Sequence, residues 1–193
     1  MKNILHVIII SLFSLTVISC SSSSDSKTTT DNTTTTSSGL FVAVGDNGTI
    51  LTSTDGTTWD NRSYETPSRL RAITYANSTF MTVGYLDEII LSSSDGITWD
   101  NKRSGTGNLR GVAYGDDKFV VVGLSGHIST SSEGTSWDNR TSGTPTGLYG
   151  VNYVNNQFVA TGQIGTIITS TDGISWDNRT IAGQSNYLYH VAY

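Results

Sequence analysis

The side chains best suited to ligand chemistry are two arginines and two tyrosines that recur at one spacing: Arg71, Arg110, Tyr149 and Tyr189. They lie 39, 39 and 40 residues apart, and His190 directly follows the last of them. A guanidinium can hold an anion by forked hydrogen bonds, and a tyrosine ring can stack on a sugar. If these positions surround one opening, they predict a site for an anionic or sugar-like ligand. The alternative is ordinary variation among surface residues.

A second candidate is the segment from Tyr85 to Glu88, which has one residue more than its equivalents elsewhere in the chain. It also lacks the glycine found at the corresponding positions Gly48, Gly126 and Gly165. Insertions in repeat proteins tend to lie on binding faces. We therefore add Tyr85 and Glu88 to the candidate ligand site, with neutral drift in a loop as the alternative.

Other charged residues recur in every copy, which indicates a structural role. An acid precedes a basic residue by two positions in four places: Asp60 and Arg62, Asp100 and Lys102, Asp138 and Arg140, Asp177 and Arg179. Positions i and i+2 share one face of a strand, so these are expected to be exposed ion pairs, each worth at most about 1 kcal/mol. His127 and His190 are isolated, and Asp46-Asn47-Gly48 lacks the further ligands of a calcium loop. We expect no metal, no cofactor and no catalytic residue.

The elements that position these side chains repeat about every 39 residues. Phe41, Phe80, Phe119 and Phe158 are each 39 apart, and Gly45, Gly84, Gly123 and Gly162 keep the same interval. Each period holds four short segments with strand-like composition, separated by glycine, asparagine and aspartate, which predicts a four-stranded antiparallel meander. A period near 40 with four strands is typical of a β-propeller blade. The predicted fold is all-β, a propeller of four blades over residues 39–193.

The turn Ser53-Thr54-Asp55-Gly56-Thr57-Thr58-Trp59 recurs in each copy. Its acid and its tryptophan occupy fixed repeat positions: Asp55, Asp95, Glu133 and Asp172, and Trp59, Trp99, Trp137 and Trp176. We interpret both sets as structural, the acid bonding to its own turn and the tryptophan entering the core. The turn resembles the Asp-box, or BNR, hairpin of sialidase-like propellers, with one residue fewer between acid and glycine.

That resemblance implies the fold and raises a sialidase-like glycoside hydrolase as one functional alternative. Such an enzyme needs three convergent arginines. Arg62, Arg140 and Arg179 occupy the same repeat position, so rotational repetition should hold them apart. Propeller proteins that help build photosystem II share this type of repeat, which makes an assembly factor of that kind a further alternative.

The phase of the repeat makes a prediction about ring closure. The folded part starts with a second-strand pattern at 40–45 and finishes with a first-strand pattern at 188–193. Pairing of these two segments would close a ring of four blades without an unpaired edge. A truncated propeller, or two chains that join into an eight-bladed ring, are the alternatives.

The first residues predict export. Residues 1–19 combine Lys2 with an apolar run and read as a signal peptide. Cys20 is the single cysteine of the chain and matches the lipidated position of a bacterial lipobox, with an ordinary secretory signal or an uncleaved anchor as the alternatives. Residues 20–38 after it are rich in serine and threonine and should be a flexible linker. We therefore expect a lipid-anchored protein of the bacterial cell envelope, on the outer membrane.

Charge narrows the choice of partners. Without Lys2 the chain has ten basic and sixteen acidic residues, which argues against a nucleic-acid partner and against a basic membrane-binding surface. The functional prediction is a non-enzymatic binding or scaffold module, attached to the membrane by lipid, that presents propeller loops to a protein or glycan ligand. It is expected to be a monomer or a ring-completing homodimer.

Overall fold

The computed structural model describes residues 39–103 and 107–192, which form four antiparallel sheets. We call the sheets blades 1 to 4 in chain order. Blade 1 contains β1 (Phe41–Val44), β2 (Ile50–Ser53) and β3 (Asp60–Asn61). Blade 2 contains β4 (Arg69–Ala76), β5 (Thr79–Tyr85), β6 (Ile90–Ser93) and β7 (Asp100–Arg103).

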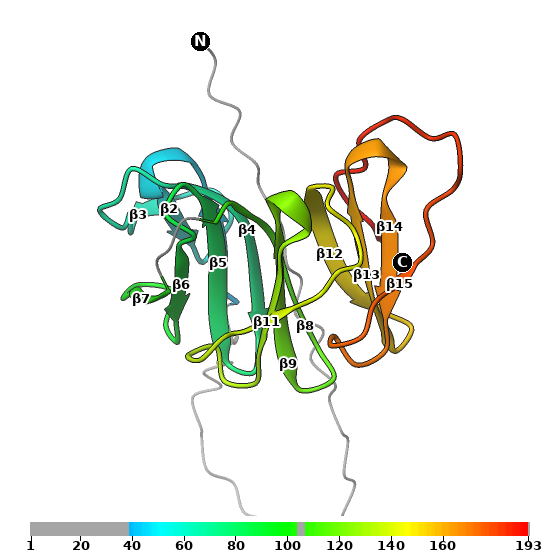
Figure 1. The fold of residues 1–193 in the computed structure, drawn as a ribbon. Coiled ribbons are helices and arrows are strands. Elements are labelled where there is room, and N and C mark those ends of the chain that lie inside the picture. Colours follow the sequence, from blue (N-terminus) through cyan, green and yellow to red (C-terminus); the bar gives the residue numbers. More distant parts are fainter. Residues whose placement is uncertain (1–38, 104–106, 193) are drawn as a thin grey trace, which may run out of the picture.

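The other two blades repeat the pattern of blade 2. Blade 3 contains β8 (Leu109–Gly115), β9 (Lys118–Gly123), β10 (Ile128–Ser131) and β11 (Asp138–Arg140). Blade 4 contains β12 (Leu148–Val154), β13 (Gln157–Gly162), β14 (Ile167–Ser170) and β15 (Asp177–Asn178). Every strand pairs only with its neighbours in the chain, and the blades follow one another across the molecule (Figure 1). The predicted four-stranded meander is confirmed for blades 2 to 4.

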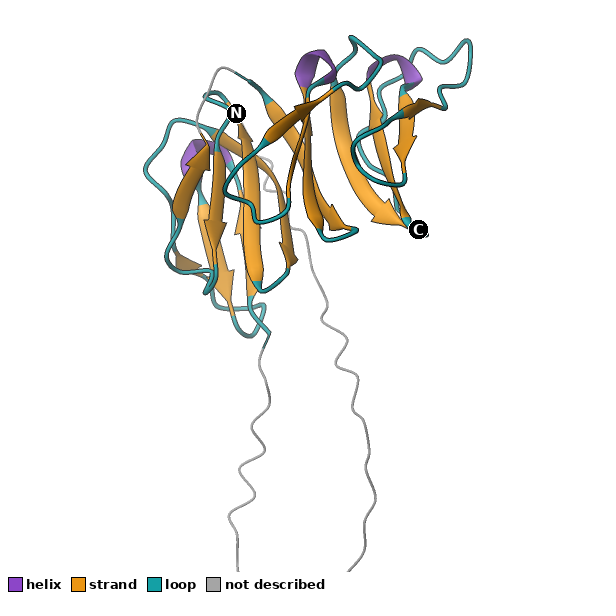
Figure 2. Ribbon diagram, turned by 60° about the horizontal axis from the view of Figure 1, so that its bottom comes forward, coloured by secondary structure: helices purple, strands orange, loops and turns teal. Residues whose placement is uncertain are grey.

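Tight turns join the strands within each blade. The first two strands of blades 2, 3 and 4 are linked by two-residue loops whose residues all have positive φ: Asn77 and Ser78, Asp116 and Asp117, Asn155 and Asn156. Two such residues are the signature of a type I′ hairpin, whose twist matches that of the strands. Three 3₁₀ turns follow β1, β9 and β13 and lie at one end of the blades: η1 (Asp46–Gly48), η2 (Leu124–Gly126) and η3 (Gln163–Gly165) (Figure 2).

The acid of the Asp-box-like turn organises its own hairpin. In blade 2, Asp95 Oδ1 accepts hydrogen bonds from the backbone N–H of Ile97 and of Thr98, both at 2.8 Å, and from Ser93 Oγ at 2.9 Å. Asp55 and Asp172 have the same bonds in blades 1 and 4. These bonds, the backbone donors foremost, lower the pKa of Asp95 from 3.8 to about 2 and also lower those of Asp55 and Asp172.

The lowered pKa values predict an acid-sensitive fold. A carboxyl whose pKa is depressed by folding stabilises the folded state above its unfolded value, 3.8, and loses this effect as the pH falls through the folded value, about 2 for Asp95. We expect the melting temperature to drop across that window, and to drop less when Asp55, Asp95 and Asp172 are all replaced by asparagine. Thermal unfolding monitored by circular dichroism at stepped pH measures this. Glu133→Gln is the matched control, and an equal drop in the triple variant would contradict the assignment.

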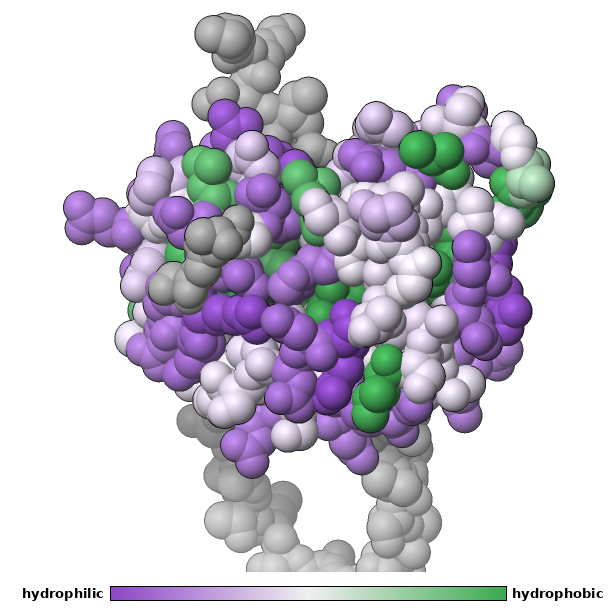
Figure 3. Space-filling model, viewed as in Figure 1, coloured by the Kyte–Doolittle hydropathy of each residue, from purple (hydrophilic) through white to green (hydrophobic). Residues whose placement is uncertain are grey.

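The hydrophobic core lies between consecutive blades. The first cluster joins blades 1 and 2, with Val42, Val44 and Ile50 against Phe80, Leu91 and Trp99. The second joins blades 2 and 3, with Met81, Val83 and Ile90 against Phe119 and Val121. The third joins blades 3 and 4, with Val120, Val122 and Ile128 against Phe158, Ala160 and Ile168. The face of the molecule drawn in Figure 3 is mostly hydrophilic, with its hydrophobic residues in small separate groups.

Ring closure within one chain, as predicted from the repeat phase, is not observed. β1 pairs only with β2, so blade 1 has three strands, and Leu188–Ala192 is not a strand. This segment stays beside blade 4, where the Leu188 N–H donates to the Gly162 carbonyl oxygen at 2.9 Å. Tyr193 lies outside the described residues, as do the predicted signal peptide 1–19, Cys20 and the linker 20–38.

Candidate functional site

A β-bulge directs the candidate ligand-binding side chains. The first strand of each of blades 2, 3 and 4 shifts register at its start, so Arg71, Arg110 and Tyr149 each stand opposite no partner residue. A bulge residue is left out of the ladder and is re-aimed relative to its neighbours. β4, β8 and β12 lie next to one another, so the three re-aimed side chains come to one region. Tyr189 holds the same repeat position in the segment after blade 4.

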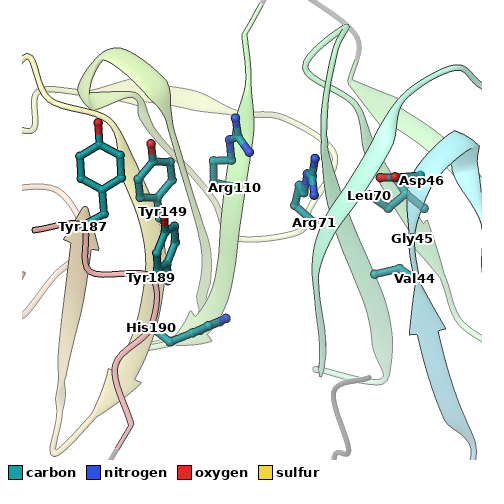
Figure 4. Close-up of a pocket in the computed structure, with 10 residues that line it drawn as sticks. All are labelled: Val44, Gly45, Asp46, Leu70, Arg71, Arg110, Tyr149, Tyr187, Tyr189 and His190. Atoms are coloured by element: carbon teal, nitrogen blue, oxygen red, sulfur yellow. The ribbon is translucent and has the colours of Figure 1, made fainter. Parts of the chain in front are cut away.

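These side chains line a cavity of about 390 Å³ (Figure 4). Its walls are formed by Val44, Gly45, Asp46, Leu70, Arg71, Arg110, Tyr149, Tyr187, Tyr189 and His190. Five of the seven residues predicted from the sequence are therefore brought together here: Arg71, Arg110, Tyr149, Tyr189 and His190. In Figure 4 the tyrosines and His190 face Val44 and Asp46 across the opening, with the two arginines between them. Ligand binding at these residues stays a prediction.

Three tyrosines form one wall of the cavity. The ring centroids of Tyr149 and Tyr189 are 5.3 Å apart in a stacked arrangement, and Tyr187 lies 5.8 Å from Tyr149. Gln163 fixes Tyr149 by donating from Nε2 to its hydroxyl oxygen at 2.8 Å. Tyr187 is 50% exposed and Tyr189 62% exposed, so both rings remain open to a ligand. Exposed aromatic faces of this kind contact sugars and apolar side chains well.

The arginines carry positive charge that nothing in the described chain neutralises. The guanidinium carbon of Arg110 lies 4.7 Å from the Tyr85 ring centroid and 5.7 Å from that of Tyr149. Neither Arg71 nor Arg110 forms an ion pair with a described carboxylate, and the Nε atom of each is buried without a hydrogen-bond partner. Burial, and then the charge of Arg71, lower the pKa of Arg110. An anion between the two guanidiniums would relieve this repulsion.

A second cavity of about 340 Å³ continues along the inner strands. It is lined by residues 72–75 of β4, 111–114 of β8, Val151, Asn152 and His190. Gly150 is required beside it, because a Cβ atom there would lie 2.4 Å from the Tyr189 carbonyl oxygen. His190 lines both cavities, so the two lie next to each other.

Tyr85 and Glu88, the two predicted loop residues, do not line the cavity. Tyr85 stacks against Arg110, whereas Glu88 turns into the space between blades 2 and 3. Its carboxylate lies 2.8 Å from Arg103 and 3.4 Å from His127, and its side chain is only 9% exposed. Leu86, Asp87 and Glu88 all have positive φ, and this backbone carries Glu88 inward. Glu88 therefore lies apart from the cavity that Arg71 and Arg110 line, and a contact between Glu88 and a ligand stays a prediction.

The geometry around His127 does not form a hydrolytic triad. Ser129 Oγ lies 2.9 Å from Nε2 of His127, and Glu88 approaches that same nitrogen atom. A triad needs the serine and the carboxylate on opposite ring nitrogens. Burial lowers the pKa of His127, against the opposing effect of Glu88. These residues are a buried polar cluster between two blades.

The repeated charged residues pair locally. Arg62, Arg140 and Arg179 each bind the acid two positions earlier, at 3.1, 3.0 and 3.0 Å. They do not converge on one site. In residues 39–103 and 107–192, no group of three or more His, Cys, Asp or Glu side chains could hold a metal ion. No helix in these same ranges is long and apolar enough to cross a membrane.

The arrangement of the blades matches known structures. YCF48 bound to a D1 peptide aligns with 74% of this chain and 52% of its own, at 19% identity and a TM-score of 0.60. YCF48 from Cyanidioschyzon merolae gives a TM-score of 0.58 at 20% identity over 74% of this chain and 53% of its own. The WD40 β-propeller domain of Doa1 gives 0.61 at 15% identity over 76% and 52%. The fold is a β-propeller.

This propeller spans about half the length of the structures that it matches. No protein-family model and no curated protein matches the sequence. The identities are low, so the likeness is one of fold. The predicted all-β propeller fold with four repeats is thereby confirmed, without the predicted closure of the ring.

Five of the ten lining residues were not predicted from the sequence, and two of them, Tyr187 and Asp46, have polar side chains. Tyr187 precedes the segment after blade 4 by one position, where the other copies have Arg69, Asn108 and Gly147. These four copies disagree as strongly as those at Arg71, so the same criterion identifies Tyr187 when it is applied two residues earlier. Asp46 was considered only as part of an incomplete calcium loop, although η1 places it on the wall of the cavity.

Proposed function

We propose that this protein is a non-enzymatic binding module, anchored to a membrane by lipid, and that its cavity takes an acidic segment of a protein ligand. The observation that carries the proposal is the pair Arg71 and Arg110, two guanidiniums without an ion-pair partner in the described chain beside a group of tyrosines. Forked hydrogen bonds from arginine suit a carboxylate. The tyrosine rings would contact the side chains on either side of that carboxylate.

The proteins that share this fold favour a protein ligand over a glycan. YCF48 carries a bound D1 peptide, and other neighbours are WD40 domains. Among the described lining residues the arginines are Arg71 and Arg110, whereas a sialidase-like site needs three convergent arginines. Binding without turnover is therefore the simpler use of this cavity.

The membrane anchor is proposed from sequence. Cys20 follows an apolar run, and the linker after it has no apolar residue to bury. Acyl chains contribute about 0.8 kcal/mol for each buried methylene, so more than one chain on Cys20 gives lasting attachment. The linker would let the propeller reach a ligand away from the membrane. Metabolic labelling with a radioactive fatty acid tests this placement. The unmodified protein should incorporate the label, and the Cys20→Ala variant should not.

The binding proposal is tested with the domain of residues 39–193 and fluorescently labelled peptides. We expect peptides with aspartate or glutamate beside an aromatic residue to bind, and their asparagine or glutamine counterparts to bind at least about tenfold more weakly, a difference of about 1.4 kcal/mol. Arg71→Ala combined with Arg110→Ala should reduce affinity by at least the same factor, and added salt should weaken binding. Fluorescence anisotropy measures all of these.

Arg179→Ala combined with Arg62→Ala is the matched control, because it removes two arginines that lie outside the cavity. Peptide affinity that survives loss of Arg71 and Arg110 would overturn the proposed site. Binding of acidic glycans but not of acidic peptides would show that the ligand is a glycan and not a protein segment. Hydrolysis of a fluorogenic sialoside that depends on Arg71 or Arg110 would make the protein an enzyme.

A further inference from the structure

The two outer blades each have one face that is less buried than its counterparts. Val159 and Ile167 of blade 4 are partly exposed. Their repeat equivalents in blades 1 to 3 are buried within the core clusters: Val42, Met81 and Val120, and Ile50, Ile90 and Ile128. Blade 4 therefore presents the same apolar face that each earlier blade packs against its successor.

Blade 1 presents the complementary face. Phe41, Leu51 and Trp59 are partly exposed. Phe80, Phe119 and Phe158, the equivalents of Phe41, are only 8%, 1% and 0% exposed, and Leu91 and Ile168, the equivalents of Leu51, are fully buried. Blade 1 thus shows the face that each later blade packs against its predecessor. The two exposed faces are the two halves of one more inter-blade cluster.

The backbone edges of the outer blades complement each other as well. Among the residues that the structure describes, β1 has no partner on the side where β5, β9 and β13 each pair with an inner strand. The segment 188–192 occupies an inner-strand position, since Leu188 donates to Gly162 as Leu70 donates to Gly45. It has no second strand beside it. An unpaired edge of this kind is a template for another strand.

The register of the missing pairing follows from the other blades. Ile73 pairs with Thr82, Val112 with Val121 and Val151 with Ala160. The repeat equivalents of these pairs are Val191 and Ala43. All three complete blades use this register, so it specifies which residues should meet.

We propose that a second copy of this chain completes the propeller, with Leu188–Ala192 of each copy pairing with β1 of the other. Within one chain the two edges face each other across the cavity (Figure 4) and do not pair. The chain also spans about half the length of its structural neighbours, which is the share that a second copy would match. The two contacts are identical and are related by a twofold axis along the channel. This inference does not depend on the proposed ligand.

The register makes a cysteine cross-link the sharpest test. The domain of residues 39–193 contains every core cluster and no cysteine, because the single cysteine is Cys20. Directly opposite residues on paired strands lie within the distance that a disulfide bridges. We therefore expect Ala43→Cys combined with Val191→Cys to form a covalent dimer under mild oxidation, at least tenfold more of it than Ala43→Cys combined with Ile181→Cys. Ile181 is 63% exposed and has no place in the pairing register.

Each outcome on a non-reducing gel decides the proposal. A dimer that reverts to monomer on reduction supports it. An internal disulfide in a monomer would show that one chain closes on itself, and free thiols would show that the edges do not pair. A ladder of larger cross-linked species would show that the copies assemble into open-ended oligomers and not into a closed dimeric ring.

A mass measurement provides a second readout that needs no disulfide. Light scattering after size-exclusion chromatography should give twice the chain mass for the unmodified domain and the single-chain mass for Val191→Asp. Val191 is partly exposed in one chain, so the charge should leave the blades folded, which circular dichroism checks. Ile181→Asp is the matched control and should remain a dimer. A monomeric unmodified domain would overturn the proposal.

Discussion

Replacing Phe119 with alanine is expected to lower the free energy of unfolding by about 3 to 5 kcal/mol. Phe119 is only 1% exposed and fills the cluster between blades 2 and 3, where Met81 and Val121 also pack. Its ring lies edge-on to Tyr114, with centroids 4.7 Å apart. Truncation removes this contact and leaves a cavity that β-sheet backbones on both sides cannot close. Urea unfolding followed by tryptophan fluorescence measures the loss.

Phe41→Ala is the control, because the same side chain at the same repeat position is partly exposed in blade 1. We expect a smaller loss of about 1 to 2 kcal/mol, in proportion to the area it buries. Both substitutions should be made in the Val191→Asp background, so that dimer formation does not cover Phe41. Equal losses at the two positions would show that blade 1 is as well packed as the interior blades.

Gly126→Ala is expected to destabilise the domain by about 3 kcal/mol, from backbone strain and overpacking together. Gly126 is buried at the end of η2 with φ of +69°, where an L side chain is strained. A Cβ atom would also lie 1.9 Å from the Thr144 carbonyl oxygen. That neighbour is backbone, so it cannot swing away as a flexible side chain would. Thermal and urea unfolding both report the change.

Gly143→Ala separates the two causes. Gly143 has nearly the same φ, +72°, but nothing lies within 4 Å of its Cβ position. Only the strain of the left-handed conformation remains, so the expected loss is about 1 kcal/mol. If both substitutions cost the same, the close approach of Thr144 would be of no consequence.

Much of the fold could be predicted because each blade has the same recurring sequence pattern. The phenylalanine and glycine positions recur in register, and the strands of blades 2 to 4 form where these positions indicate. Ring closure could not be predicted in the same way. Strand pairing depends on local alternation, whereas the angle between blades depends on how Met81, Phe119 and their neighbours fill each interface. A sequence repeat predicts that the blades pack against one another. It does not predict how many blades are needed to close the propeller ring.

The candidate residues were chosen where the copies disagree, and the structure brings three of them, Arg71, Arg110 and Tyr149, to one cavity. The β-bulge that aims these residues leaves no mark in an alternating pattern, because it changes the register without changing residue type. The position of Glu88 outside this cavity could not be predicted for a related reason. Its direction depends on three consecutive residues with positive φ, a backbone that side chains of this size rarely adopt.

Because every core cluster requires two consecutive blades, no blade can bury its apolar side chains alone. A chain that emerges from its amino-terminal end must therefore wait for blade 2 before the first stable nucleus forms, and each later blade then adds to a surface already in place. All the strand pairs are hairpins between neighbours, so this growth needs only short loops to close. Refolding of the complete chain can start at any of the three interfaces and spread from blade to blade, and in a single chain the two end blades should open first.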